Sequence, residues 1–201
     1  MSGKEKISNI PNILTILRIL IAIALVFLLY AQKGLPADRL APWNWISLIL
    51  FVIGAVSDYI DGYLARKYGW VTNFGKLFDP LADKFLIAFS LIMLTDLQRV
   101  PGWITVILVG RDIAVTGLRG LASEMGVVIA AAWSGKFKTL AELLAVGGYI
   151  YWGDLWFLNG EKWGNFFVIF AIILALWSGF EYFARFWKVV TMEEKVEEGK
   201  Q

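Results

Sequence analysis

The chain has 201 residues, 58% of them hydrophobic, and a mean hydropathy of +0.63, which is typical of an integral membrane protein folded as one helical bundle. It contains no cysteine and no histidine, which excludes disulfides, thiolate zinc sites, cysteine nucleophiles and histidine general bases. A net charge of +2, with no open basic stripe, excludes a nucleic-acid partner. Any chemistry must therefore run on carboxylates, amines, guanidinium groups and hydroxyls.

The apolar runs predict an all-α fold: an integral membrane bundle of six transmembrane helices in a single domain, residues 1–201. Residues 1–12 form a short basic segment, which we expect to lie along the membrane surface or to fray. The first run, residues 13–30, is long enough to span and lacks a small-residue cleavage site, so it predicts a retained helix rather than a signal peptide. Each run approaches the roughly 20 residues that cross about 30 Å of hydrocarbon. The later spans are expected at residues 43–66, 78–97, 101–123, 136–158 and 163–187, followed by a charged tail, residues 189–201, that frays into solvent.

Lysine and arginine predict the orientation of these helices. Of the 19 such residues, only Lys33, Arg39, Arg99 and Lys162 fall in the loops after the first, third and fifth spans. The positive-inside rule places the opposite side in the cytoplasm, together with both termini. The protein is therefore expected in a plasma membrane of bacterial inner-membrane type, with the segment that joins the second and third spans facing the cytosol.

That cytosolic segment carries four aspartates, Asp58, Asp61, Asp79 and Asp83. An ionisable group in a bilayer costs about 2.5–3.5 kcal/mol even on lenient scales, so four together require a compensating partner. Carboxylate oxygens without nitrogen or sulfur ligands favour Mg²⁺, Mn²⁺ or Ca²⁺. Four of them could hold two divalent ions, an arrangement that clamps a phosphate during in-line displacement.

The spacing of these residues fits two facing helices. Asp58, Asp61, Gly62 and Ala65 recur at i, i+3, i+4 and i+7, and Asp79 and Asp83 at i and i+4, so each set shares one helix face. A turn over residues 69–75 would bring the two faces together, and Pro80 suits the first turn of the second helix.

Two simpler interpretations remain open for these residues. Gly62 and Ala65 could leave room for a ligand beside the metals, or could only allow close helix packing. The aspartates could instead form a structural ion-pair network with the cations nearby in sequence, Arg66, Lys67, Lys76 and Lys84.

The pattern Asp58-x2-Asp61-Gly62-x2-Ala65-Arg66-x8-Gly75-x3-Asp79-x3-Asp83 resembles the signature of the CDP-alcohol phosphotransferase family. The resemblance implies transfer of a phosphoalcohol group from a CDP-linked donor to an alcohol, release of CMP, dependence on Mg²⁺ or Mn²⁺ with two divalent ions expected, and a homodimer. It implies that Asp58, Asp61, Asp79 and Asp83 form the metal site, and that Asp83 is also the general base. The CDP-binding residues it implies are Asp58, Gly62, Ala65, Arg66 and Gly75.

A second cluster of basic residues is predicted at the same face, and it narrows the range of possible acceptor molecules. Its five members are Arg18, Arg111, Arg119, Lys136 and Lys138. They could bind the phosphate of an acceptor, or could snorkel to lipid phosphates. The segments 111–119 and 130–139 resemble a subgroup of the family that joins CDP-diacylglycerol to sn-glycerol 3-phosphate, so phosphatidylglycerophosphate is the expected product. Inositol phosphate, phosphatidylglycerol and serine are the alternative acceptors.

Two other classes of protein are weighed against this prediction. Membrane prenyltransferases also combine acidic motifs with Mg²⁺, but they usually carry two such motifs, whereas this chain has one. Transporters and channels place acids along an ion path, whereas these acids lie at one face, without paired broken helices.

Overall fold

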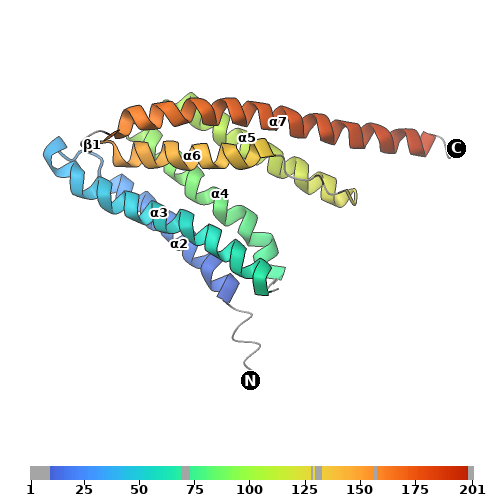
Figure 1. Cartoon of the computed structure of the whole chain (residues 1–201), viewed down its shortest axis with the longest axis horizontal. Coiled ribbons are helices and arrows are strands. Elements are labelled where there is room, and N and C mark those ends of the chain that lie inside the picture. The colour runs from blue at the N-terminus through green and yellow to red at the C-terminus, as the bar shows by residue number, and fades with distance from the viewer. Residues whose placement is uncertain (1–9, 69–72, 128, 130–132, 156–157, 199–201) are drawn as a thin grey trace, which may run out of the picture.

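The computed structural model describes residues 10–68, 73–127, 129, 133–155 and 158–198; for residues 10–15, 58–68, 73–83, 155, 158 and 192–198 it describes the backbone alone. Within these residues the fold is all-α, as predicted, with six helices (Figure 1). They are α2 (Ile10–Ala31), α3 (Ala37–Tyr68), α4 (Asn73–Asp96), α5 (Gly102–Glu124), α6 (Trp133–Tyr151) and α7 (Gly160–Glu198).

Each predicted span corresponds to one helix, but several boundaries were wrong. The span predicted to reach residue 158 ends at Tyr151, because Trp152 has a φ of 45°, a left-handed conformation that stops a helix. After it, β1 (Asp154–Leu155) pairs antiparallel with β2 (Leu158–Asn159). The tail expected to fray is helical through Glu198, consistent with the good helix formers in its sequence.

The start of the chain and the joint between α3 and α4 also differ from the prediction. Residues 10–12, predicted to be interfacial, belong to α2, and residues 1–9 lie outside the described part of the chain. A turn was predicted over residues 69–75, but α4 already begins at Asn73, so Gly75 lies inside a helix. Pro80 lies in the interior of α4 and not in its first turn. Pro80 has no N–H for the helical bond to the carbonyl four residues earlier.

The helices form two groups that meet at one end of the molecule. α2, α3 and α4 pack together, α6 packs closely with α7, and α5 lies against α7. Contacts of α3 and α4 with α6, and of α4 with α5, join the groups. Figure 1 shows the groups converging where the α2–α3 and α6–α7 connections lie and diverging toward the opposite end.

Arg99, in the α4–α5 connection, ties the converging end together. The sequence placed it among the few loop cations, yet its side chain is buried. Its guanidinium donates hydrogen bonds to the carbonyls of Tyr149 (3.3 Å) and Ile150 (3.0 Å) in the last turn of α6, and to Gln32 Oε1 (2.9 Å) and Asn44 Oδ1 (3.0 Å). Burial lowers the pKa of Arg99 to about 10, which leaves it charged at neutral pH. A cation here satisfies carbonyls that a helix end leaves unpaired.

Glycines allow α6 and α7 to approach each other closely. A Cβ atom built on Gly148 would lie 2.7 Å from the backbone nitrogen of Gly164 and 2.9 Å from the carbonyl oxygen of Gly160. A Cβ on Gly164 would lie 2.7 Å from the ring of Tyr149. Small residues at such crossings are a usual device of membrane helix packing.

We expect Gly148→Ala to destabilise the fold by about 1–3 kcal/mol, because the new methyl group meets rigid backbone. Gly147→Ala is the matched control, since its Cβ would find its nearest neighbour, Leu48 Cδ1, at 3.7 Å, an ordinary contact. Thermal unfolding in detergent micelles measures both variants. Equal melting temperatures for the two would contradict this account of the α6–α7 contact.

The outer surface of the bundle is rich in large apolar side chains. Within the described residues, two helical segments are long and apolar enough to cross a membrane, Ala37–Ser57 (21 residues) and Gly160–Thr191 (32 residues), and Ile16–Ala31 is a shorter apolar segment. Phe27, Val106 and Phe180 are among many exposed apolar residues. Such continuous apolar exposure is typical of a surface in contact with lipid.

Candidate active site

The two aspartate pairs lie on neighbouring helix ends. Asp58 and Asp61 belong to the last turns of α3, and Asp79 and Asp83 belong to the first half of α4. The helical backbone confirms the periodicity assumed for their spacing, and only residues 69–72 separate the two helices. The side chains of all four lie outside those described, as do Gly62, Ala65, Arg66 and Gly75, so their roles stay predictions.

A buried charge cluster lies deeper in the bundle, between α5 and α6. Lys138 Nζ lies 2.5 Å from Asp112 Oδ1 and 2.7 Å from Glu142 Oε2. Both Lys138 and Glu142 are 1% exposed. Arg111 adds a second cation: its guanidinium lies 2.9 Å from Asp112 Oδ1 and donates a 2.7 Å hydrogen bond to Ser178 Oγ on α7. Buried charges persist where they are paired, and this cluster pairs them between α5 and α6, with Ser178 of α7 as a neutral hydrogen-bond partner.

A small polar cavity opens beside this cluster. Its charged and polar walls come from four helices: Arg18 of α2, Lys84 of α4, Asp112 of α5, and Thr139 and Glu142 of α6. Its apolar walls include Ala55 of a fifth helix, α3. Ala55 precedes Asp58 by one turn, and Lys84 directly follows Asp83. The cavity is therefore adjacent, along both α3 and α4, to the helix ends that carry the aspartates.

The charges around the cavity favour an anion. Arg18 and Lys84 line it, and Arg111 and Lys138 contact its acidic walls, whereas the carboxylates are only Asp112 and Glu142 among the side chains described. Among the described side chains, the cations at the cavity and its walls therefore outnumber the acids. A phosphate group is a ligand that such cations can bind.

The five basic residues predicted to bind the acceptor fall into two groups in the structure, one near the cavity and one away from it. Arg18, Arg111 and Lys138 gather at the cavity or its walls. Arg119 lies over the ring of Tyr182, 5.8 Å from its centroid, and Lys136 lies over the ring of Trp133 at 4.7 Å. Both latter residues are exposed and lie outside the cavity wall.

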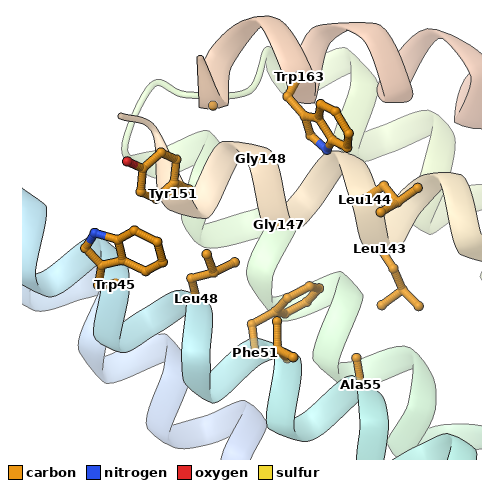
Figure 2. Close-up of a pocket in the computed structure, with 12 residues that line it drawn as sticks. Trp45, Leu48, Phe51, Ala55, Leu143, Leu144, Gly147, Gly148, Tyr151 and Trp163 are labelled. Atoms are coloured by element: carbon orange, nitrogen blue, oxygen red, sulfur yellow. The ribbon is translucent and has the colours of Figure 1, made fainter. Parts of the chain in front are cut away.

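Two apolar grooves flank the polar cavity. The first, of about 350 Å³, lies between α3, α6 and the start of α7, and Figure 2 shows Trp45, Phe51 and Leu143 among its lining side chains. It shares Ala55 and Leu143 with the polar cavity. The second, of about 490 Å³, lies between α4 and α5 and shares four residues with the cavity, Lys84, Ile87, Asp112 and Glu142. A polar cavity joined to apolar grooves suits an amphiphilic ligand, with its polar group inside and its chains outside.

Several residues at this site were missed or underused by the sequence analysis. Lys84 was considered only as an ion-pair partner for the aspartates, Thr139 only as part of segment 130–139, and Glu142 and Ser178 were not considered. A signal existed for Glu142, because it is a carboxylate inside an apolar run, four residues after Lys138. Ser178 carries no such signal, since serine is common in membrane helices.

Fold and site together define a helical-bundle protein with an apolar outer surface, a buried cationic cavity and a conspicuous aspartate motif at adjacent helix ends. Residues 8–177 match the family model described as CDP-alcohol phosphatidyltransferase, so the match covers most of the chain. The chain belongs to the CDP-alcohol phosphatidyltransferase family, which confirms the resemblance found in the aspartate motif.

Curated relatives cover nearly the whole chain. A CDP-diacylglycerol–glycerol-3-phosphate 3-phosphatidyltransferase of Bacillus subtilis is 35% identical over 192 residues, which are 90% of this chain and 97% of the relative. A probable phosphatidylglycerophosphate synthase of Mycobacterium tuberculosis is 36% identical, over 92% of this chain and 85% of the relative. A phosphatidyltransferase of Haemophilus influenzae with the same name as the Bacillus protein is 36% identical, over 87% of this chain and 91% of the relative.

Proposed function

We propose that this protein transfers the phosphatidyl group of CDP-diacylglycerol to sn-glycerol 3-phosphate, which yields phosphatidylglycerophosphate and CMP. The observation that carries the proposal is the cationic cavity beside the aspartate helices, flanked by apolar grooves. It matches a reaction that brings a lipid and a small phosphorylated acceptor to one site. The names of the relatives support the same pair of substrates.

The cations at the cavity and its walls support a phosphorylated acceptor over one without a phosphate. Serine, an alternative acceptor, carries no phosphate and so brings no such anion to the cavity. We assign the acceptor phosphate to Arg18, Arg111 and Lys138, with Lys84 as an additional cation near the cavity. Arg119 and Lys136, which lie outside the cavity, are better placed to attract anions to this end of the protein.

The chemistry of the aspartate motif suits a divalent metal. Asp58, Asp61, Asp79 and Asp83 supply only carboxylate oxygens, on two helix segments that follow one another closely, and these are the donors that Mg²⁺ and Mn²⁺ prefer. We propose that these four residues hold two divalent ions. When bound, such ions neutralise phosphate charge and polarise the P–O bonds.

In the proposed reaction, Asp83 takes the proton of the primary hydroxyl of glycerol 3-phosphate. The hydroxyl oxygen forms a bond to the phosphorus that carries diacylglycerol, and the bond from that phosphorus to the CMP oxygen breaks, so that CMP leaves. Arg66 binds the phosphate oxygens of the departing nucleotide with its planar guanidinium. Gly62, Ala65 and Gly75 leave space for the cytidine diphosphate. Positioning and electrostatics supply most of the rate enhancement, as in other phosphoryl transfers.

We further propose the setting in which this reaction occurs. The distribution of lysine and arginine supports a cytoplasmic position for the aspartate motif and for both termini. In this orientation, water-soluble glycerol 3-phosphate would enter and CMP would leave on the cytoplasmic side. A homodimer is proposed from the family resemblance.

An acceptor screen tests the proposed function. Purified protein receives CDP-diacylglycerol and Mg²⁺ with glycerol 3-phosphate, inositol phosphate, serine or phosphatidylglycerol, and CMP release is measured. We expect glycerol 3-phosphate to support the highest rate by at least about tenfold, because only a correctly shaped phosphorylated acceptor fills a site built for its polar groups. Preference for any other acceptor would refute the proposal without removing the protein from its family.

Removal of divalent metal is expected to abolish CMP release. Chelation followed by dialysis should reduce the rate by more than about 100-fold, because phosphate charge is then no longer neutralised, and Mg²⁺ or Mn²⁺ should restore it. The control is the melting temperature before and after chelation, which separates loss of chemistry from unfolding. Full activity in metal-free protein would show that the aspartates act in another way.

A further inference from the structure

Glu142 has a buried carboxylate oxygen, Oε1, with no hydrogen-bond donor among the residues that the structure describes. Its side chain is 1% exposed, and Oε2 lies 2.7 Å from Lys138 Nζ. Oε1 accepts no hydrogen bond from any residue whose side chain the structure describes. A buried carboxylate oxygen without a donor is costly, so natural proteins keep one only where something else supplies the hydrogen bond.

That oxygen belongs to a residue that lines the polar cavity. Lys84 and Asp112 lie on the facing helices α4 and α5, and Thr139 lies one turn earlier on α6. Lys138 is held between Asp112 and Glu142, so one side of the Glu142 carboxylate is committed to the ion pair. The other side remains for a ligand in the cavity.

The charge of Glu142 selects the kind of ligand group that can meet it. A phosphate oxygen would be repelled by the carboxylate, whereas a neutral hydroxyl can donate a hydrogen bond to it. The surrounding cations attract phosphate to the same cavity. The ligand should therefore carry a hydroxyl a few bonds away from a phosphate, in addition to the hydroxyl that reacts.

We propose that Glu142 is a specificity-determining residue that accepts, through Oε1, a hydrogen bond from the secondary hydroxyl of a glycerol-type phosphorylated acceptor. The inference rests on the proposed function and adds to it the group that distinguishes glycerol 3-phosphate from simpler hydroxyalkyl phosphates. Asp112 shares Lys138 with Glu142 and acts as a positioning residue, because it holds that ammonium group at the cavity wall.

The test compares two acceptors that differ only in this hydroxyl. The ratio of kcat/KM for sn-glycerol 3-phosphate to that for 3-hydroxypropyl phosphate is measured in wild-type protein and in variants. We expect a wild-type preference of about 10- to 100-fold, because the analogue leaves a buried acceptor unpaired. Glu142→Leu should reduce the ratio to near one, and Glu142→Gln should retain most of it, because an amide oxygen still accepts a hydrogen bond.

Glu181→Gln is the matched control, since Glu181 bonds Ser134 (2.9 Å) and pairs with Arg185 away from the cavity. It should leave the ratio unchanged. An equal loss for both acceptors in Glu142→Leu would overturn the proposal and assign Glu142 a purely structural role. If that variant does not fold, the wild-type ratio decides, because a ratio near one is incompatible with recognition of the secondary hydroxyl. Use of an acceptor unrelated to glycerol 3-phosphate would instead refute the proposed function.

Discussion

Asp83→Asn is expected to lower kcat by about 100- to 10,000-fold, the usual contribution of a positioned general base. The amide cannot accept the proton of the acceptor hydroxyl. Asp83 is proposed as the carboxylate least committed to the metal, so the concentration of Mg²⁺ that gives half-maximal rate should change little. Steady-state CMP release across a Mg²⁺ titration measures both quantities in one experiment.

Asp79→Asn is the comparison for this variant. Asp79 lies one turn earlier on α4 and is proposed to act only as a metal ligand, so its loss should raise the Mg²⁺ requirement as well as lower the rate. If Asp83→Asn turns over at a rate near that of wild type, Asp83 is not the base. If both variants show the same shift in Mg²⁺ dependence, the separate roles assigned to them are wrong.

Lys138→Met is expected to be the most destabilising single substitution in the site. Lys138 is 1% exposed, and its ammonium group contacts both Asp112 and Glu142. Removal of one partner from a buried ion pair costs about 3–5 kcal/mol, because the remaining carboxylate has no compensating charge. Thermal unfolding in detergent measures the loss, and CMP release should fall as the acceptor site is disrupted.

The double variant Lys138→Met with Glu142→Leu separates charge from packing. It replaces a buried ion pair by apolar side chains, which is often close to neutral for stability. We expect it to recover much of the stability lost in Lys138→Met, while acceptor binding stays impaired. Lys136→Met, two residues away but exposed over Trp133, should shift stability by less than about 1 kcal/mol. If Lys138→Met were as stable as wild type, the buried ion pair would contribute nothing to the stability of the fold.

The helices could be predicted from sequence because their signal is local. Apolar runs of bilayer length identified all six, since both membrane insertion and helix formation depend on contiguous residues. The ends were less predictable. α6 stops at Tyr151 because of the backbone conformation of Trp152, and Pro80 lies within α4, although proline usually marks a helix start.

Only the part of the site that belongs to a recognisable sequence motif could be predicted. The aspartate spacing indicated the family, which the match over residues 8–177 confirms. The partners of buried charges depend on which helices pack together, and this is not visible in a single sequence. Arg99 was counted as a loop cation but is buried against the end of α6, and Glu142 was overlooked although it lines the cavity. Both are charges whose environment is created by residues distant in sequence.

Transfer from labelled substrate tests the central claim most directly. Purified protein in lipid vesicles receives CDP-diacylglycerol, Mg²⁺ and sn-glycerol 3-phosphate labelled in its carbon skeleton, and both the lipid fraction and CMP are quantified. We predict that label enters a lipid with the mass of phosphatidylglycerophosphate, one molecule for each CMP released, and that CMP release stops when glycerol 3-phosphate is omitted. Release of CMP at the same rate without the acceptor, or without label in the lipid, would contradict the account.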